Sequence, residues 1–332
     1  MRLSVIIPVH NGGDNLALCL EAIAASTRPP DEVIVVDDGS TDGSSDLATR
    51  HGAHVIRFDG PPRWPAFARN RGAEAARGDL LVFFDADVAA HADTLARLER
   101  CLVEHSEIAA VFGSYDANPL ARGIVSRYKN LLHHFTHQHG RREASTFWTG
   151  CGAIRRDLFL ACGGFDESFR MIEDIELGVR LWRAGHRLWL CPDIQVTHLK
   201  RWTLVTLLRS DILDRAVPWT RLILKSGHLP DDLNVSAESR LSALAAWTAA
   251  GCLALAFWMP WAWIGLPLAA AAMGALNAEL YRFFARQGGW GFALGAIGLH
   301  GLYLLYSSLV FGSMLTWHAL RTMGGKSNAQ SL

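Results

Sequence analysis

Two long stretches of this 332-residue chain contain no Asp, Glu, Lys or Arg. They run from residue 241 to 278 and from 288 to 320, whereas residues 1–240 carry nearly all of the charge. At about 1.5 Å per residue, one straight helix of the first stretch would be much longer than the hydrocarbon core of a bilayer, which is about 30 Å thick. The chain is therefore predicted to be a globular unit followed by membrane segments.

The turn Met259-Pro260-Trp261 divides the first uncharged stretch and predicts a hairpin of two spans, 241–258 and 261–278. The tryptophans near this turn suit an aromatic belt at a membrane surface. A third span is expected at 290–315, which completes a membrane domain at 241–320 and leaves a tail at 321–332. A two-span arrangement with one long tilted helix is the alternative.

Residues 203–240 form the predicted connector between the two parts. Within it, segment 204–227 mixes leucines with basic residues around Pro218, namely Arg209, Arg215, Arg221 and Lys225. This pattern is typical of amphipathic helices that lie on a membrane surface. A surface helix packed on the globular unit would look the same, so both interpretations stay open.

Bulk composition excludes some classes of function. Lys plus Arg equals Asp plus Glu, 32 each, which argues against nucleic-acid binding. The six cysteines are scattered without a CxxC pair, as in a domain with reduced thiols in the cytosol. The N-terminal apolar run is short and lacks a small-residue cleavage site, so no signal peptide is expected.

The first 115 residues alternate between short apolar runs and helical patterns. Strands are predicted at 4–9, 32–38, 53–58, 80–87 and 108–113, with helices between them. Continuous apolar strands separated by helices indicate an α/β fold with a mainly parallel sheet covered on both faces. Ligands of such sheets bind beyond the carboxyl ends of the strands.

Polar clusters follow three of these strands: HNGG, DDGSTDGS and DADV. Each alone would be read as an ordinary turn, because Asp, Gly and Ser are common turn residues. Three on the same edge favour a binding site. No GxGxxG follows the first strand and no GxxxxGK[ST] occurs, so the dinucleotide and P-loop interpretations lack their motifs.

Asp85 and Asp87 end the most apolar strand and, one residue apart, project to the same side of an extended chain. Divalent cations that bind phosphates take one or two protein carboxylates and complete their shell with phosphate oxygens and water. The pair is therefore predicted to hold Mg²⁺ or Mn²⁺ against a diphosphate. The alternative is a turn that precedes a helix at about 92–105.

Four segments together resemble the family 2 glycosyltransferases of GT-A fold: SVIIPVHN, VVDDGSTDGS, ARNRGAEAARGDLLVFFDAD and GGFDESFRMIEDIELGVRLWRAGH. The resemblance covers about residues 1–202, in order and with the spacing of the family. It implies a Rossmann-like GT-A domain, a nucleotide-sugar donor, a divalent metal and inversion at the anomeric carbon.

The resemblance also implies roles for individual residues. Asp174 of the pair Glu173-Asp174 would be the catalytic base, and Asp85, Asp87 and His198 would hold the metal. Donor-binding roles fall on Pro8, Asn11, Asp37, Asp38, Arg69, Asn70, Asp85, Gly150, Gly152, Arg201 and Trp202. The segment from His198 to Trp202 is similar to the QxxRW box of processive synthases, but His replaces Gln, which argues against processivity.

Inverting transfer needs one base to deprotonate the attacking hydroxyl, and a metal can stabilise the leaving group. Asp174 precedes a predicted helix, 175–184, whose dipole favours the anion. Ordinary helix N-terminal charge is the alternative for both acidic residues. His133 and His137 have the i,i+4 spacing of a zinc site, but no Glu lies between them as in HExxH. Segment 122–142 is better interpreted as part of the acceptor side of the site.

The sequence therefore predicts a multi-pass enzyme of the cell membrane with a cytoplasmic catalytic domain. A UDP-sugar donor and a lipid-linked acceptor are expected. Arg282 and Arg286 then fall inside, as the positive-inside rule prefers, whereas Arg321 falls outside. The alternatives are a processive polysaccharide synthase subunit, a catalytically dead scaffold, and a nucleotidyltransferase, for which no basic pyrophosphate loop is found near the N-terminus.

Overall fold

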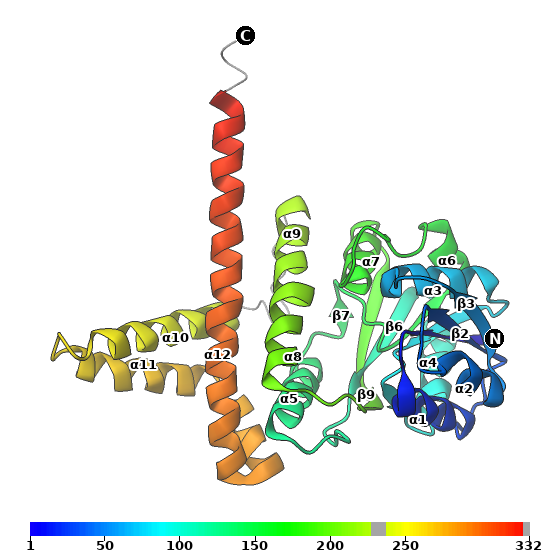
Figure 1. Ribbon diagram of the computed structural model, residues 1–332, viewed down its shortest axis with the longest axis horizontal. Coiled ribbons are helices and arrows are strands. Elements are labelled where there is room, and N and C mark those ends of the chain that lie inside the picture. Colours follow the sequence, from blue (N-terminus) through cyan, green and yellow to red (C-terminus); the bar gives the residue numbers. More distant parts are fainter. Residues whose placement is uncertain (227–236, 328–332) are drawn as a thin grey trace. The chain divides into compact units, whose positions relative to one another are not determined.

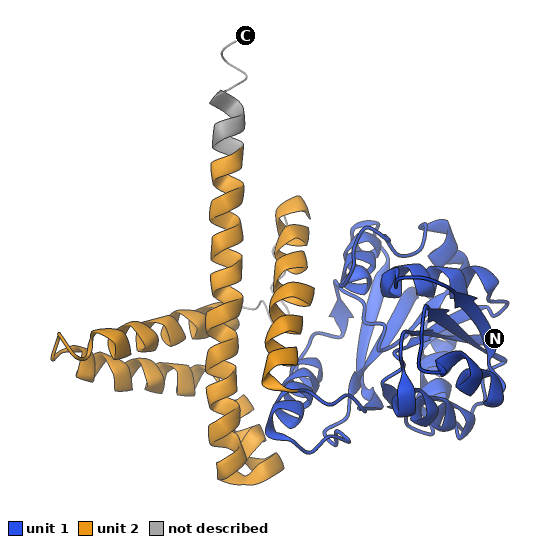
Figure 2. Cartoon of the chain, viewed as in Figure 1, with its two compact units in different colours: residues 1–202 blue, residues 203–332 orange. Residues whose placement is uncertain are grey.

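The computed structural model describes residues 1–226 and 237–327. The chain forms two compact units, Met1–Trp202 (unit 1) and Thr203–Leu332 (unit 2), which Figure 2 colours separately. The predicted connector at 203–240 and the predicted tail at 321–332 each lie partly outside the described residues.

Unit 1, all of which is described, contains one nine-stranded mixed sheet in the order β3-β2-β1-β4-β8-β6-β9-β5, with β7 beside β9. The strands β1 to β4 pair in parallel, β8 runs antiparallel to both β4 and β6, and β6 and β9 are parallel. The strand bounds are β1 Leu3–Val9, β2 Glu32–Asp38, β3 His54–Phe58, β4 Leu80–Phe84, β5 Val88–Ala90, β6 Ile108–Tyr115, β7 Glu143–Ala144, β8 Cys151–Arg155 and β9 Arg187–His198.

Helices cover both faces of this sheet (Figure 1). Their bounds are α1 Gly13–Ala24, α2 Ser44–Arg50, α3 Trp64–Ala75, α4 Thr94–Glu104, α5 Ile124–Gln138, α6 Arg156–Ala161 and α7 Glu173–Arg183. Alternate residues of β1 serve the two faces: Val5 and Ile7 join the core under α1 and α4, whereas Ile6 faces α3. A Cβ on Gly72 of α3 would come within 2.5 Å of Ile6, so glycine permits this close helix–sheet contact.

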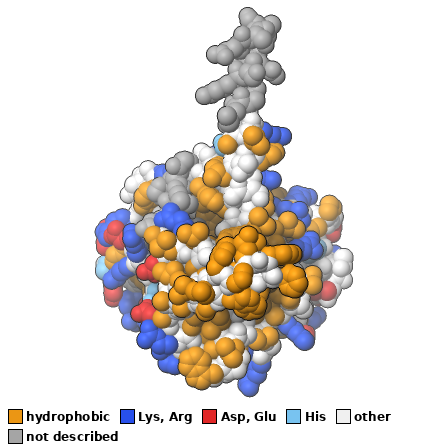
Figure 3. Space-filling view, turned by 90° about the vertical axis from the view of Figure 1, so that its left-hand side faces the viewer, with side chains coloured by type: hydrophobic (Ala, Val, Ile, Leu, Met, Phe, Trp, Pro, Cys, Tyr) orange, Lys and Arg blue, Asp and Glu red, His pale blue; other side chains and the backbone are white. Residues whose placement is uncertain are grey.

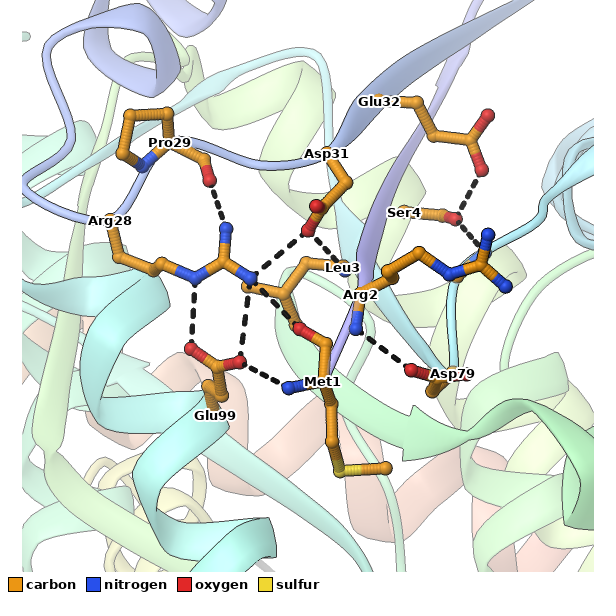
Figure 4. Close-up of polar contacts among 11 residues, drawn as sticks. Met1, Arg2, Leu3, Ser4, Arg28, Pro29, Asp31, Glu32, Asp79 and Glu99 are labelled. Atoms are coloured by element: carbon orange, nitrogen blue, oxygen red, sulfur yellow. Dashed lines mark hydrogen bonds and ion pairs between the residues drawn. The ribbon is translucent and has the colours of Figure 1, made fainter.

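A network of ions and hydrogen bonds holds the start of β1, as Figure 4 shows. The Arg28 guanidinium bonds Glu99 at 2.9 Å and Asp31 at 3.0 Å, and Glu99 also pairs with the N-terminal ammonium at 3.1 Å. The backbone N–H of Leu3 donates to Asp31 at 2.8 Å. The network therefore ties β1 to the segment that leads into β2 and to α4.

Unit 2 is helical in its described residues. Its elements are α8 Leu204–Arg209, the π-helix η1 Ser210–Ala216, α9 Val217–Ser226, α10 Ala237–Leu255, α11 Ala262–Leu276 and α12 Ala278–Ser327. Gly289, with φ at 75°, bends α12. By length and composition, one described helix, Ala278–Arg321, could cross a membrane. The predicted spans 241–258 and 261–278 fall largely on α10 and α11, and their number stays a prediction.

Candidate active site

The two motif aspartates follow β4, and each faces a cation. Asp85 accepts a bond from Arg69 Nη2 at 2.5 Å, and Asp87 lies 3.8 Å from Lys200 Nζ. Their side chains are 32% and 26% exposed. Opposite charges and partial exposure offset the cost of placing two carboxylates at the end of a buried strand.

Arg69 joins this motif to the acidic pair of α7. It is buried on α3, and its Nη1 donates to the Glu173 carboxylate while Nη2 donates to Asp85. Burial raises the pKa of Glu173 to about 7, against the opposing charge of Arg69. Burial also disfavours the charged guanidinium, but the surrounding carboxylates outweigh it and the pKa of Arg69 is raised. One cation thus bridges carboxylates more than 80 residues apart in the sequence.

Asp174, the next residue, lies in a more open environment. It is half-buried, and its Oδ2 accepts bonds from the backbone N–H and the hydroxyl of Thr149, both at 3.1 Å. Ile172, which precedes the Glu173-Asp174 pair, has a φ of 66°, an uncommon conformation for a β-branched side chain. Two neighbours at one helix start therefore differ: Glu173 is enclosed by Arg69, and Asp174 is held by neutral donors.

The loop before β8 holds Thr149 and Gly150, and Gly152 lies in β8 itself. All three come beside β4, because Cys151 pairs with Phe84 and Gly152 with Phe83. A Cβ on Gly150 would come within 2.3 Å of the Trp148 ring, and one on Gly152 within 2.4 Å of the Trp148 carbonyl oxygen. Both glycines are needed for Trp148 to fold back over this loop.

The predicted donor residues near β1 and β2 bond to neighbouring loops. Asn11 has a φ of 54° and accepts a bond from the backbone N–H of Thr41 at 2.9 Å, and Pro8 lies on β1 opposite Val36. Asp37, which is buried, accepts bonds from Ser40 N and Ser45 Oγ.

Asp38 accepts bonds from the backbone N–H groups of Arg63 and Trp64, at 2.6 and 2.8 Å, at the start of α3. These carboxylates order the loops after β1 and β2, and their contact with a nucleotide stays a prediction.

Other predicted residues make contacts away from the two acidic motifs. The Asn70 amide donates to Phe165 O and to Glu167, and these two bonds use both of its amide hydrogens. Its oxygen accepts a bond from Phe165 N. Arg201 is exposed, whereas Trp202 is buried and its backbone N–H bonds Ser126 Oγ at 2.8 Å. Their donor-binding roles stay predictions.

His198 is buried at the end of β9, where it pairs with Val88 and stacks on Tyr115 at 4.2 Å. His133, His137 and Trp148 complete an aromatic cluster with Tyr115. Across the described ranges no three His, Cys, Asp or Glu side chains gather as a ready metal cluster. The histidine pair of α5 therefore packs within this aromatic cluster.

Sequence reasoning missed His91 and Asp116. The imidazole Nε2 lies 3.0 Å from the buried Asp116 carboxylate, which also accepts the Thr197 hydroxyl at 2.5 Å. The hydrogen bond to the Asp116 carboxylate raises the pKa of His91. Burial would raise the pKa of Asp116, but the bonds from His91 and Thr197 outweigh it and lower the pKa. The sequence signal that could have identified Asp116 is its position directly after strand β6, where a carboxylate follows an apolar strand.

Residues 4–163 match the model of Glycosyl transferase family 2, and the sheet of unit 1 is that of GT-A enzymes. Unit 1 is therefore a family 2 glycosyltransferase domain of GT-A fold, and the protein is a glycosyltransferase. The resemblance seen in the sequence motifs and the predicted fold class are both confirmed.

Two similar proteins are named for the synthesis of succinoglycan and of the O-antigen chain. The chain is 28% identical over 285 residues to the succinoglycan biosynthesis protein ExoA of Rhizobium meliloti, covering 77% of this chain and 84% of that protein. It is 26% identical over 210 residues to the O-antigen chain rhamnosyltransferase WbaN of Salmonella anatum, covering 60% and 67%.

One solved structure has the same fold over most of the chain. The mannosyltransferase PcManGT from Pyrobaculum calidifontis, in complex with GDP-Man and Mn²⁺, superposes with a TM-score of 0.60 at 21% identity. The match covers 93% of this chain and 86% of that one.

Proposed function

We propose that this protein is a membrane-bound, metal-dependent inverting glycosyltransferase that moves a sugar from a nucleotide donor to an acceptor attached to a lipid. The observation that carries the proposal is the Arg69 bridge, which brings the Asp85 motif and the Glu173-Asp174 pair to one place. A leaving-group site and a base must be neighbours for an in-line displacement.

Asp174 is the proposed base. Thr149 orients its carboxylate with two bonds to Oδ2, and the side chain is open enough to receive a proton from an acceptor hydroxyl. Glu173 is enclosed by Arg69 and serves to hold that guanidinium rather than to meet the acceptor. Together with Arg69, it fixes the start of α7 next to β4.

The side chains after β4 suit a hard divalent cation. Asp85 and Asp87 offer carboxylate oxygens and are partly exposed, which is the donor set that Mg²⁺ or Mn²⁺ takes beside phosphate. His198 is the third proposed contact. A bound cation would stabilise the negative charge on the departing diphosphate. The Mn²⁺ in the PcManGT complex supports this assignment.

The donor and the acceptor are proposed from the sequence motifs and from the similar proteins. We favour a UDP-sugar as the donor, because carboxylates such as Asp37 and Asp38 are compatible with a uridine base. The PcManGT complex contains GDP-Man, so GDP-sugars are tested alongside UDP-sugars. Relatives named for succinoglycan and O-antigen synthesis support an acceptor in cell-envelope assembly. A lipid-linked acceptor also agrees with the apolar helices of unit 2.

The test uses membranes that contain the wild-type chain, supplied with labelled UDP-, GDP- or dTDP-sugars, Mn²⁺ and a lipid extract. We expect label in the organic phase with one donor, loss of transfer in Asp174→Asn, and retained nucleotide binding. Glu176→Gln is the matched control, because this carboxylate lies in the same helix turn but bonds Arg180. Loss of nucleotide binding in Asp174→Asn would contradict the base assignment.

Asp87→Ala should weaken donor binding only when metal is present. Donor affinity is measured with and without Mn²⁺ for both chains. An unchanged response to Mn²⁺ would remove Asp87 from the metal site.

A further inference from the structure

The middle of α12 is bonded to the charged connector of unit 2. The Tyr306 hydroxyl donates to the buried carboxylate of Asp211, on η1, at 2.5 Å. Helices η1 and α9 pack along α12, as Figure 1 shows. His300 and Tyr303 lie on the same side of α12 at i,i+3 spacing and stack on one another. The apolar helix thus has a polar side, which contacts the connector through Tyr306, whereas His300 lies 3.0 Å from the Tyr281 hydroxyl within α12.

This contact conflicts with a transmembrane α12. Tyr306 lies near the middle of the part of α12 that follows the kink at Gly289, residues 290–321. If α12 crossed the membrane, Asp211 would therefore lie at about the bilayer midplane. Arg209 and Arg215 are exposed and only two and four residues from Asp211, or about 3–6 Å along a helix axis. Their charges would then lie deep in hydrocarbon, which membrane proteins avoid unless the charges face partners or water.

The hairpin of α10 and α11 has the opposite character. From 241 to 278 it carries no formal charge, and beyond its base it packs mainly on itself around Cys252, Ala256 and Ala262. Phe257 is 89% exposed and Trp258 is 72% exposed at its tip. Figure 3 shows hydrophobic side chains gathered over the face that Figure 1 draws at its left, where this hairpin lies.

The dimensions of the hairpin also fit a bilayer. Helix α10 is about 28 Å long and α11 about 22 Å, so with the apolar turn from Ala256 to Trp261 the hairpin spans most of a hydrocarbon core of about 30 Å. Within unit 2 the hairpin runs crosswise to α12 (Figures 1 and 2). If one of the two stands across the membrane, the other lies along it.

We infer that the α10–α11 hairpin is the element that crosses the membrane, and that α12 lies along the membrane surface with α8, η1 and α9. The partner of the exposed apolar hairpin is the acyl region of the bilayer, and its tip tryptophans reach the far headgroups. Four exposed basic residues of the connector meet anionic headgroups on the near side: Arg209, Arg215, Arg221 and Lys225.

The inference rests on the membrane location in the proposed function, and it replaces the three crossings predicted from the sequence by two. With an even number of membrane crossings, Arg321 lies on the same side of the membrane as the catalytic unit. The positive-inside rule, which three crossings violate at this residue, is then satisfied.

The test labels single added cysteines in the full chain with a membrane-impermeant maleimide, in intact cells and in inverted vesicles. Glu21→Cys reports the catalytic side, Met259→Cys the hairpin tip and Arg321→Cys the end of α12. The native cysteines are buried or half-buried, so wild-type chain gives the background. We expect Glu21→Cys and Arg321→Cys to label from one side and Met259→Cys from the other.

Arg321→Cys labelled from the side opposite Glu21→Cys would overturn the inference, as would Met259→Cys labelled from the same side as Glu21→Cys or from neither. Trp261→Cys is the second tip variant in case Met259→Cys does not accumulate. A chain that remains in the aqueous fraction as a dimer through the hairpin would also overturn it. Labelling needs no turnover, so failure of the transferase proposal leaves this result readable.

Discussion

Replacing Arg69 by Met tests whether one guanidinium couples the two acidic motifs. The side chain is 4% exposed and contacts Asp85 and Glu173 at once. Met fills similar space without charge, so the change removes the bridge more than the packing. We expect the stability of unit 1 to fall and transfer activity to fall with it, because Asp85 and α7 lose their common anchor.

The size of the effect follows from burial. Removing one partner of a buried ion pair costs about 3–5 kcal/mol, because the other charge stays enclosed. Glu173 can limit this cost by taking up a proton, since its pKa is already about 7. We therefore expect a loss near 3 kcal/mol, or a fall in Tm of about 6–12 °C for a domain of this size.

The pH dependence has a defined sign. A carboxyl whose folded pKa is raised stabilises the fold below its unfolded pKa, near 4.3, and loses that contribution as pH rises through the folded value. In Arg69→Met the folded pKa of Glu173 rises further, because its cation is gone. The stability difference between the variant and the wild type should therefore widen above pH 7.

The assay is thermal and denaturant unfolding of the full chain in detergent, for wild type, Arg69→Met, Glu173→Gln and the double variant. Arg71→Met is the control, since this arginine pairs with Glu74 and Glu167 at the surface and should cost at most about 1 kcal/mol. The double variant should be more stable than the sum of the single losses predicts, by about 1–3 kcal/mol. Additive losses would refute the bridge as a coupling element.

Two further outcomes are expected. Gly178→Ala should destabilise unit 1 by about 1–3 kcal/mol, because its Cβ would lie 2.2 Å from the Phe147 backbone nitrogen. Gly123 has open space around it, so Gly123→Ala should be near neutral. Equal unfolding midpoints of the two variants would contradict this packing. Burial would raise the pKa of Glu99, but Arg28 and the N-terminal ammonium outweigh burial and lower the pKa. The stabilisation by Glu99 is therefore present above about pH 4.3 and is lost as pH falls through the lowered folded pKa. Acid unfolding of Arg28→Met should depend less on pH in this range, and an unchanged acid profile would count against the network.

The parallel half of the sheet could be predicted because its signal is local. The strand predicted at 32–38 has the same bounds in the structure, and the one at 4–9 differs by one residue. The strands β8 and β9 were missed for local reasons too. Cys151–Arg155 contains a glycine and is short, and Pro192 interrupts the apolar pattern of Arg187–His198.

The candidate site was predictable as motifs but not as contacts. Asp85, Asp87 and Asp174 carry recognisable neighbours in the sequence, whereas the partners of Arg69 lie 16 and 104 residues away along the chain. The pairing of His91 with Asp116 likewise depends on β5 and β6 lying on either side of β9. Such pairs are set by the order of strands in the sheet, which periodicity does not report.

The different roles of Glu173 and Asp174 illustrate what the fold adds to a motif. Both residues sit at the start of α7, where the helix dipole favours an anion, so sequence position gives them equal electrostatic support. Their side chains nonetheless point to different partners, Arg69 for one and Thr149 for the other. A base must have one oxygen that reaches an acceptor, and a carboxylate enclosed by a guanidinium does not. The bridge therefore supports Asp174 as the proposed base, and we expect Glu173→Gln to lower activity through stability and positioning and Asp174→Asn to remove the chemical step.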